Sequence, residues 1–283
     1  MDLDGKVAIV TGASRGVGAA TGVALAEAGC RVACAARSTR DVPQRTPGTL
    51  DETLDRVKAV GGTAHAIPTN LADRDEVRAM VAGTVGRFGG VDILINNAAV
   101  TFIGDLQHPE HRHDLTFAVN YWAPYVAIQE VSPHMERRGG GAIINVSSLA
   151  ALLPLPNMLS YGTSKIALEH LTLDAARELY PKRIAVNCFR IDIGVASEGF
   201  VANTPGADRS DWEPCEVPAE GIVWMLRRPP EYTGQRESMY HLREREGIMP
   251  TRAAQSSDRR PTPTELFAGL YEMGPSNFVE PYD

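Results

Sequence analysis

The sequence predicts a single-domain, three-layer α/β fold in which helices cover both faces of a doubly wound parallel sheet. Short apolar runs alternate along the chain with helical patterns of about a dozen residues or more, as expected for parallel strands joined by crossover helices. A glycine-rich turn follows the first apolar run, where folds of this class bind nucleotides. The 283 residues, 43% of them hydrophobic, are enough for one large domain.

Composition and charge argue against several classes of protein. No apolar run approaches the ~18 residues of a membrane span. The acidic N-terminus lacks the basic start and apolar run of a signal peptide. The four cysteines show no disulfide-framework spacing, so we expect reduced thiols and a cytoplasmic protein. The formal net charge of −7 argues against nucleic acid as the main partner.

The first expected strand covers residues 6–11, and a helical pattern follows the turn G-A-S-R-G-V-G. Gly12, Gly16 and Gly18 let the backbone turn tightly and approach a ligand closely. Strand, turn and helix together aim backbone N–H groups at one point, which suits a pyrophosphate. The spacing G-x-x-x-G-x-G differs from the general dinucleotide pattern, so a tight turn without a ligand is the alternative. We predict a Rossmann-like nucleotide site here.

The second expected strand, residues 31–36, ends at Arg37. An acidic residue about 20 positions after the glycines would bind a ribose 2′-hydroxyl and indicate NAD. Here Ala36 and Arg37 occupy that place, and Arg15 lies inside the glycine turn. Two guanidinium groups suit a 2′-phosphate, so we favour NADP(H), with NAD(H) and two solvated arginines as the alternative.

The remaining elements follow in order. Residues 49–52 (T-L-D-E) have the pattern of a capping box, and an amphipathic helix follows them. The run at 142–147 is apolar and rich in β-branched residues, as is typical of a buried parallel strand. Further strands are expected at residues 63–68, 91–96 and 183–189, and helices at 73–88, 109–136 and from about 157.

Groups that could act in catalysis follow the 142–147 strand. Tyr161 and Lys165 are four residues apart on the next helix, so they share one face. A nearby ammonium group favours the phenolate and lowers the pKa of a tyrosine toward neutral pH. A serine at the strand end could hold the oxygen of a substrate. A solvated surface pair is the alternative, because this spacing often arises by chance.

Seven short motifs occur in order within residues 5–235, and together they make the chain similar to the short-chain dehydrogenase/reductase family. The motifs are T-G-A-S-R-G-V-G (11–18), N-N-A-A (96–99), Asn120, N-V-S-S (145–148), Y-G-T-S-K (161–165), V-N (186–187) and Y-T-G-Q (232–235). Each motif alone is weak, but their joint order and spacing are specific.

The resemblance implies a catalytic tetrad of Asn120, Ser148, Tyr161 and Lys165. Ser148 is preferred to Ser147 because the family places its serine thirteen residues before the tyrosine. Tyr161 would be the general acid or base, and Ser148 would donate a hydrogen bond to the substrate oxygen. Lys165 would lower the pKa of Tyr161 and hold the nicotinamide ribose. Asn120 would hold a water that extends a proton path from Lys165.

The resemblance also implies contacts to cofactor and substrate, and no metal site. The expected cofactor residues are Gly12, Ser14, Arg15, Gly16, Val17, Gly18, Arg37, Asn70, Leu71, Asn97, Ala98, Ala99, Tyr161, Lys165 and Ile193. The expected substrate residues are Ser148, Ala150, Leu155 and Tyr161. Residues 149–156 are apolar, which predicts an apolar substrate. The alternative is that several of these side chains belong to the core.

Some positions depart from the family pattern. Ile191-Asp192 stands where the family usually has Pro-Gly, beside the nicotinamide. We favour an Asp192 side chain that points away and serves a loop over one with a direct role. Ser197 is the nearest candidate for the threonine that holds the carboxamide. Asn70 replaces a usual aspartate at the adenine, and Ala99 replaces a usual glycine.

We divide the chain into a catalytic domain, residues 1–235, and an extension, residues 236–283, that packs on the same domain or on a neighbouring subunit. Within the domain, residues 194–217 are polar and are expected to form a substrate loop or lid. His108, His111 and His113 are interpreted as a solvated loop at a helix start rather than a metal site.

The leading hypothesis is an NADP(H)-dependent oxidoreductase of an apolar secondary alcohol and its ketone, or of an aldehyde. We expect a homo-oligomer, either dimer or tetramer, with no membrane and no nucleic-acid partner. One alternative is a non-catalytic NADP-binding regulatory protein, motivated by the altered turn at Asp192. Another is an epimerase or dehydratase built on the same fold.

Overall fold

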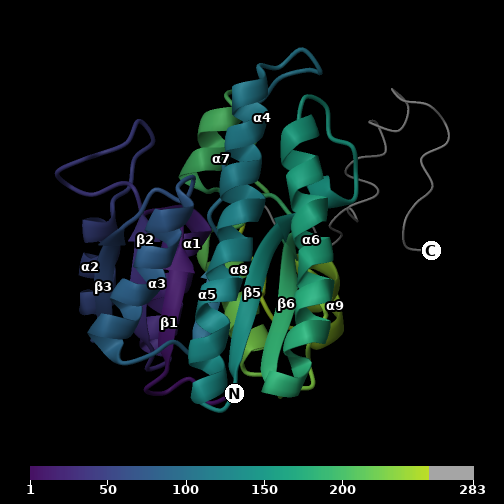
Figure 1. Cartoon of the computed structure of the whole chain (residues 1–283). Helices are drawn as coiled ribbons and strands as arrows, with labels where there is room; N and C mark the ends of the chain where they lie inside the picture. Colours follow the sequence, from purple (N-terminus) through teal and green to yellow (C-terminus); the bar gives the residue numbers. More distant parts are fainter. Residues whose placement is uncertain (255–283) are drawn as a thin grey trace.

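A computed structural model describes residues 1–254 and contains one seven-stranded parallel sheet (Figure 1). The strand order is β3-β2-β1-β4-β5-β6-β7. The chain winds outward from β1 in both directions, so the predicted doubly wound α/β fold is confirmed. The strands are β1 (Val7–Thr11), β2 (Arg31–Ala36), β3 (Thr63–Pro68), β4 (Ile93–Asn96), β5 (Gly141–Ser148), β6 (Ile184–Ile191) and β7 (Arg236–Ser238).

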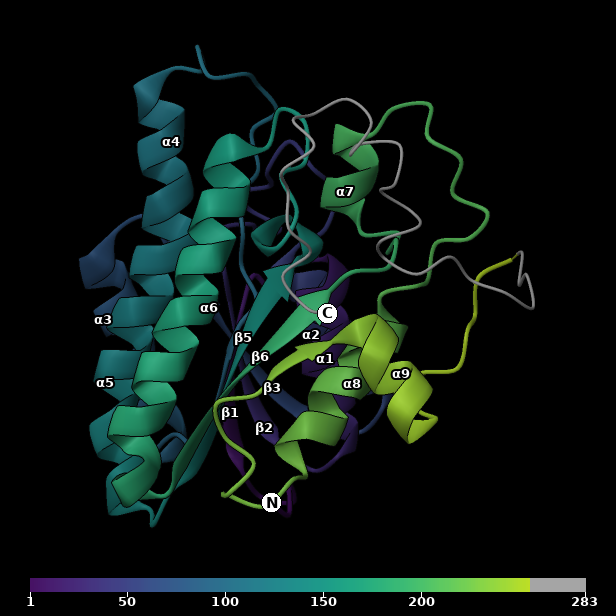
Figure 2. The ribbon, with the colours of Figure 1, turned by 90° about the vertical axis from the view of Figure 1, so that its right-hand side faces the viewer.

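Helices form a layer on each side of the sheet, as the view turned by 90° shows (Figure 2). One layer contains α1, α2, α8 and α9, and the other contains α3, α4, α5 and α6. The helices, including the short α7, are α1 (Gly16–Glu27), α2 (Leu50–Ala59), α3 (Arg74–Phe88), α4 (Glu110–Phe117), α5 (Ala123–Arg137), α6 (Leu159–Leu179), α7 (Glu198–Asn203), α8 (Glu216–Leu226) and α9 (Met239–Glu246).

The core lies on both faces of the sheet, and β1 shows why its sequence is apolar throughout. Ala8 and Val10 belong to the apolar cluster beneath α1 and α8. Val7 and Ile9 belong to the opposite cluster, beneath α3 and α5. Since successive side chains of a strand point to opposite faces, a strand covered on both sides needs a continuous apolar run.

Local signals set the helix starts where the sequence predicts them. The capping box at α2 is present, because Thr49 Oγ1 accepts from the Glu52 N–H at 3.2 Å and Glu52 Oε2 accepts from the Thr49 N–H at 3.0 Å. Asp73 caps α3 through its own side chain, with its Oδ1 accepting from the Asp75 N–H at 2.8 Å. Such caps satisfy N–H groups that have no partner inside the helix.

Three boundaries differ from the sequence-based expectation. The helix predicted at 109–136 is broken by a five-residue π-helix, Ala118–Trp122, that contains Asn120. β5 and β6 run to Ser148 and Ile191, slightly beyond their predicted ends, because these two residues still pair across the sheet. Such π-turns inside helices occur often at functional sites.

The first part of the expected extension packs on the catalytic domain. Residues 236–238 form β7, which pairs in parallel with β6 and completes the sheet. α9 follows and packs against β6 and α8. Of the two alternatives for the extension, residues 236–254 follow the first, and residues 255–283 lie outside the described residues. No helix within residues 1–254 is long and apolar enough to span a membrane, and all four cysteines are free thiols.

Candidate active site

One large cavity of about 910 Å³ lies along the carboxyl ends of the strands. Its wall contains the glycine turn, the end of β2, the end of β5 and one face of α6. Every residue predicted to contact the cofactor lines it: Gly12, Ser14, Arg15, Gly16, Val17, Gly18, Arg37, Asn70, Leu71, Asn97, Ala98, Ala99, Tyr161, Lys165 and Ile193. Parallel α/β folds bind ligands at this edge, at the point where the winding direction reverses.

The glycine turn is packed so closely that side chains are excluded from it. Gly12 has a φ of +68°, and a Cβ there would lie 2.8 Å from the Cα of Ala98. A Cβ on Gly18 would collide with the carbonyl oxygen of Gly12. Gly16 also has a positive φ, +56°, and lines the cavity. The backbone of β1 and α1 is thereby exposed to a ligand at the start of the helix, as a pyrophosphate requires.

Two arginines lie at the end of the cavity formed by β2. Arg15 donates from Nη2 to the carbonyl oxygen of Gly48 at 3.0 Å, while its Nε is buried without a hydrogen-bond partner among the described residues. Burial lowers the pKa of the Arg15 guanidinium. Arg37 is exposed at the cavity rim. An unpartnered buried donor beside a second cation fits an anionic group such as a cofactor phosphate.

The predicted catalytic side chains Ser148, Tyr161 and Lys165 all line the same cavity. Tyr161 and Lys165 lie on the first turns of α6, with the Lys165 Nζ 5.6 Å from the centre of the Tyr161 ring. Lys165 is 2% exposed and donates from Nζ to the carbonyl oxygen of Val146 at 2.7 Å. Ser148 accepts a hydrogen bond from the Ala150 N–H at 3.3 Å, and its side chain favours the phenolate form of Tyr161.

Burial dominates the electrostatics of this group. The pKa of Tyr161 is raised, because desolvation outweighs the opposing interaction with Ser148. The pKa of Lys165 is lowered to about 8, chiefly by burial. The Lys165 ammonium donates to the Val146 carbonyl, and its effect of lowering the pKa of Tyr161 stays a prediction. A neutral Tyr161 hydroxyl therefore lies beside the Lys165 ammonium, which loses its proton as the pH rises above about 8.

Asn120 lies behind the cavity wall and does not line it. Its Oδ1 accepts from the Val100 N–H at 2.8 Å, and its Nδ2 donates to the Val100 carbonyl at 3.1 Å and to Ser164 Oγ at 3.0 Å. Both functional groups of this fully buried amide are therefore engaged. The π-helix places Asn120 so that it ties the loop after β4 to α6.

The expected substrate residues are only partly brought together. Ser148, Leu155 and Tyr161 line the cavity, whereas Ala150 is 6% exposed and does not. The substrate residues named from the sequence do not include several apolar lining residues, namely Phe102, Leu115, Val119, Met158 and Tyr240. Phe200 and Trp212 also line the cavity, and both lie in the expected substrate loop, residues 194–217.

Part of the expected lid forms α7 and covers the glycine turn. Phe200 of α7 stacks on Trp212 with ring centres 4.6 Å apart. Ser197 caps α7, accepting from the Phe200 N–H at 3.3 Å, and it also lines the cavity. A Cβ on Gly16 would lie 3.2 Å from the Cβ of Ser197. The segment thus closes one side of the cavity, and its opening and closing as a lid remain a prediction.

Asp192 lines the cavity, but its carboxylate bonds to β7 and α9. Its Oδ1 accepts from the Tyr240 N–H at 3.0 Å, and its Oδ2 accepts from the Ser238 hydroxyl. The carboxylate thereby caps α9, as the structural role that we favoured for it requires, and the absence of a direct role in the reaction stays a prediction. Burial raises the pKa of Asp192.

The histidines at the start of α4 show no metal-ligand arrangement. Within residues 1–254 there is no group of three or more His, Cys, Asp or Glu side chains placed to hold a metal ion. His113 Nδ1 instead hydrogen-bonds Ser160 Oγ at 2.8 Å.

Comparison with known proteins identifies the family to which this site belongs. A family profile described as short chain dehydrogenase matches residues 6–195. The chain belongs to the short-chain dehydrogenase/reductase family. This short-chain dehydrogenase/reductase is 37% identical over 183 residues to the 3-oxoacyl-(acyl-carrier-protein) reductase FabG of Staphylococcus aureus, covering 64% of this chain and 72% of the relative. It is 38% identical over 188 residues to human dehydrogenase/reductase SDR family member 4, covering 66% and 65%.

Solved structures resemble this short-chain dehydrogenase/reductase over most of its length. A protein from Xanthomonas campestris assigned as a dehydrogenase has a TM-score of 0.81 at 30% identity, covering 91% of this chain and 97% of that one. A metagenomic short-chain oxidoreductase in complex with NADP has a TM-score of 0.70 at 29% identity, covering 84% and 99%. A 7α-hydroxysteroid dehydrogenase complexed with NADH has a TM-score of 0.74 at 26% identity, covering 83% and 93%.

Family membership makes this short-chain dehydrogenase/reductase an oxidoreductase that acts on CH–OH groups with NAD(P). The site geometry fits such a cofactor: the backbone is open at the glycine turn, and the buried Nε of Arg15 has no hydrogen-bond partner within residues 1–254. The glycine turn, Arg15 and Arg37 would hold its phosphates, and Tyr161 and Lys165 would lie at its reactive end.

The burial of Lys165 predicts a stability that depends on pH. Its pKa is about 8 in the folded state and 10.5 in the unfolded chain, so the folded state disfavours the bound proton. The resulting penalty is fully present below pH 8 and disappears as pH rises to 10.5. Lys165→Met should remove the penalty, roughly 3 kcal/mol before the lost bond to Val146 is counted. The difference in unfolding free energy between variant and wild type should shrink over that range.

Denaturant unfolding at pH 7, 8, 9 and 10, read as the difference between the two proteins, checks this prediction about Lys165. Taking the difference cancels the cysteine and tyrosine titrations that both proteins share. Lys58→Met on the exposed face of α2 is the matched control, and its difference from wild type should not change with pH. A constant difference for Lys165→Met would mean that Lys165 titrates normally in the folded protein.

Proposed function

We propose that this protein is an NADP(H)-dependent reductase of apolar ketones or aldehydes, with Tyr161 as the proton donor and the reverse oxidation as its microscopic counterpart. The observation that carries the proposal is that Ser148, Tyr161 and Lys165 meet in one cavity with the open glycine turn and two arginines. Proton donor, oxygen-binding hydroxyl and dinucleotide cradle are the components that this reaction needs.

The choice of NADP(H) rests on Arg15 and Arg37. One similar structure holds NADP and another holds NADH, so the fold accepts either cofactor and the choice depends on local charge. β2 ends at Ala36 with no carboxylate to meet a ribose 2′-hydroxyl. The unpartnered Nε of Arg15 and the exposed Arg37 side chain favour a 2′-phosphate. When bound, the nicotinamide supplies the hydride.

In the direction of reduction, Ser148 donates a hydrogen bond to the carbonyl oxygen of the substrate. Tyr161 passes its hydroxyl proton to the same oxygen as negative charge develops there. A raised pKa keeps Tyr161 protonated at neutral pH, which is the state that a proton donor requires. The Lys165 ammonium stabilises the phenolate that forms, provided that it is itself protonated, below a pH of about 8.

A water held by Asn120 would return a proton to this group, as the family resemblance implies. The side-chain groups of Asn120 are already bonded to Val100 and Ser164. A water would therefore bind its backbone, which the π-helix takes out of the regular helical hydrogen-bond ladder.

The substrate would be apolar because the cavity wall around Ser148 is apolar. Leu155 and Met158 come from the loop between β5 and α6, and Phe200 and Trp212 come from the segment that contains α7. The name of the Staphylococcus aureus relative indicates a carbonyl substrate on an acyl chain. The reduction of a carbonyl flanked by apolar groups fits both observations.

A non-catalytic, NADP-binding regulatory role loses its main support. That alternative was motivated by Asp192 in place of the usual turn, and Asp192 instead caps α9. No contact in the described residues favours an epimerase or a dehydratase over simple oxidoreduction.

A homo-oligomer remains our proposal, supported by Trp122 and Tyr125, which are 37% and 41% exposed on one helix surface. A cytoplasmic location also remains a proposal, supported by the free thiols.

Removal of one oxygen atom at Tyr161 tests the proposed function. Tyr161→Phe should lower kcat for ketone reduction by about a hundredfold to ten-thousandfold, because the proton donor is lost. Loss of NADPH absorbance with acetophenone, cyclohexanone and methyl acetoacetate measures kcat. Tyr180→Phe, at an exposed position just after α6, is the matched control and should retain full activity. Undiminished turnover in Tyr161→Phe would refute the mechanism.

The cofactor preference is tested at Arg37. Arg37→Ala should raise the Kd for NADPH by about tenfold to a hundredfold and leave that for NADH nearly unchanged, because a charge-assisted hydrogen bond to the 2′-phosphate is lost. Titration of nicotinamide fluorescence gives both constants. Arg40→Ala is the control: Arg40 is also exposed but pairs with Asp55 at 3.3 Å. Equal weakening for the two cofactors would contradict the assignment.

A further inference from the structure

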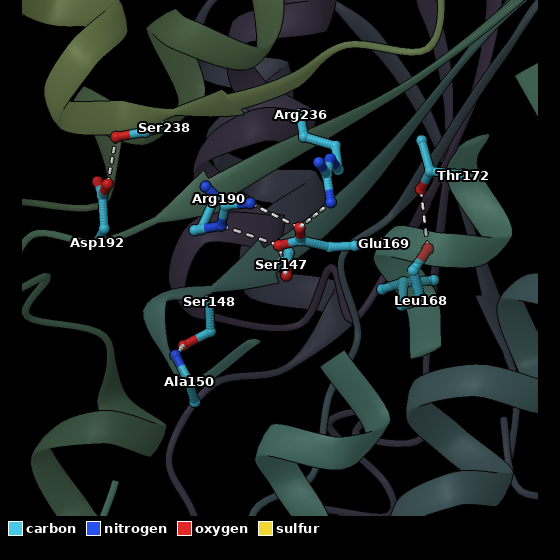
Figure 3. A network of polar contacts seen from close by, with 10 residues as sticks. All are labelled: Ser147, Ser148, Ala150, Leu168, Glu169, Thr172, Arg190, Asp192, Arg236 and Ser238. Atoms are coloured by element: carbon cyan, nitrogen blue, oxygen red, sulfur yellow. Dashed lines mark hydrogen bonds and ion pairs between the residues drawn. The ribbon is translucent and has the colours of Figure 1, made fainter. Parts of the chain in front are cut away.

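A buried carboxylate lies one helical turn beyond Lys165. Glu169 is 0% exposed on α6, and its Oε1 accepts from Ser147 Oγ at 2.7 Å and from Arg190 Nε at 2.9 Å. Its Oε2 accepts from Arg190 Nη2 at 2.6 Å. Figure 3 shows Arg236 reaching the same carboxylate from β7, with its Nη1 3.9 Å from Oε2. The guanidinium of Arg190 thus forms a bidentate ion pair with the Glu169 carboxylate, through two parallel hydrogen bonds.

The partners of Glu169 are neighbours across the sheet. Ser147 on β5 pairs directly with Arg190 on β6, and Arg190 pairs in turn with Ser238 on β7. One carboxylate on α6 therefore binds the carboxyl ends of two adjacent strands at the same level and lies within ion-pair distance of a third. This is the edge of the sheet that borders the active-site cavity.

Three consecutive residues of β5 contact three successive turns of α6. The Val146 carbonyl accepts from Lys165, Ser147 donates to Glu169, and Ser148 lies beside Tyr161 in the cavity wall. Because neighbouring side chains of a strand point to opposite faces, the bond that fixes Ser147 also fixes the direction of Ser148. Glu169 and Lys165 are four residues apart on one helix face. The hydrogen bond between Ser147 and Glu169 therefore also fixes the rotation of α6 about its axis, and with it the position of Lys165 at the end of β5.

Stability alone does not account for this pair. Removing two charges from water is costly, and apolar residues of similar volume usually serve as well or better in a protein interior. The hydrogen-bond ladder already joins β5 to β6 along eight residue pairs. A buried ion pair fixes direction more strictly than an apolar contact does, because its hydrogen bonds have definite geometry.

The pair also sets the charge around Lys165. On α6 the ammonium has Tyr161 on one side and Glu169 on the other, and β5 presents only neutral groups to it. On β6, Cys188 lies close enough to act on the ammonium, and Arg190 binds Glu169. Cys188 and, more weakly, Glu169 favour the protonated lysine. Loss of the Glu169 charge would remove one of these two contributions.

We propose that Glu169, together with Arg190, is a positioning residue for the reaction, which holds Lys165 and Ser148 in register at the end of β5. This inference rests on the proposed function, since it assigns Glu169 a role through Lys165 and Ser148. Ser147 gains a defined role as the link between the carboxylate and the strand.

Glu169→Gln tests the inference because it keeps the shape and removes the charge. We expect kcat for acetophenone reduction to fall about tenfold to a hundredfold through misplacement of the reacting groups. We also expect the alkaline fall of kcat to begin about one pH unit lower. Thermal unfolding without NADPH, measured in parallel, records the loss of stability.

The matched control is Asp92→Asn at the opposite end of the sheet. Asp92 is also buried, 3% exposed, and also accepts two hydrogen bonds from one arginine, Arg138, at 2.8 and 3.0 Å. This control should lose stability and keep the wild-type pH profile. If Glu169→Gln behaves in the same way, with wild-type kcat and pH profile, the pair is structural only and the inference is overturned.

A charge-neutral double variant keeps the test decisive if Glu169→Gln fails to fold. Glu169→Leu/Arg190→Met should unfold at or above the wild-type temperature and yet reduce the ketone more slowly than wild type. Full activity in the stable double variant would overturn the inference. Should neither variant fold, Ser147→Ala removes one neutral donor, and an unchanged kcat would count against the proposal. Failure of the proposed function would appear differently, as no wild-type turnover or as full turnover in Tyr161→Phe.

Discussion

The hydrogen bond from Lys165 Nζ to the Val146 carbonyl, 2.7 Å long and buried, is the contact on which the site depends. It joins the end of β5 to the first turns of α6, and every group proposed to handle the substrate oxygen lies on one of these two elements. A charged amine in a dry interior is unfavourable unless it has partners. The strand supplies a carbonyl, and the helix supplies Glu169 one turn away.

This constraint accounts for the electrostatics of the reaction. Burial weakens the hold of Lys165 on its proton and strengthens that of Tyr161. The pair therefore consists of a neutral acid next to a cation, which suits proton donation to a carbonyl that is being reduced. The dinucleotide cradle lies at the far side of the same cavity, where Gly12 and Gly18 leave the backbone bare. The same edge of the sheet therefore carries both the proton-donating group and the dinucleotide site.

Most of the fold could be predicted from the sequence because its signals are local. The apolar runs, the capping box at Thr49 and the glycine turn each act within a few residues. The expected tetrad rests on motifs whose order is specific. The capping of α9 by Asp192 and the engagement of Glu169 could not be predicted, since each depends on a partner distant in the chain. The pairing of β7 with β6 could not be predicted either, because it leaves little trace in three residues. Ala150 does not line the cavity, because the backbone after Ser148 forms a tight turn that buries it.

The pH dependence of a single turnover tests the central claim most directly. Enzyme loaded with NADPH is mixed with acetophenone, and the rate of nicotinamide fluorescence loss is recorded across the neutral and alkaline range. A neutral Tyr161 donor beside a cationic Lys165 predicts a constant rate at neutral pH and a fall as pH passes about 8, where Lys165 loses its proton. A rate that rises with pH through the neutral range and on past 8 would require the phenolate, and would contradict the account.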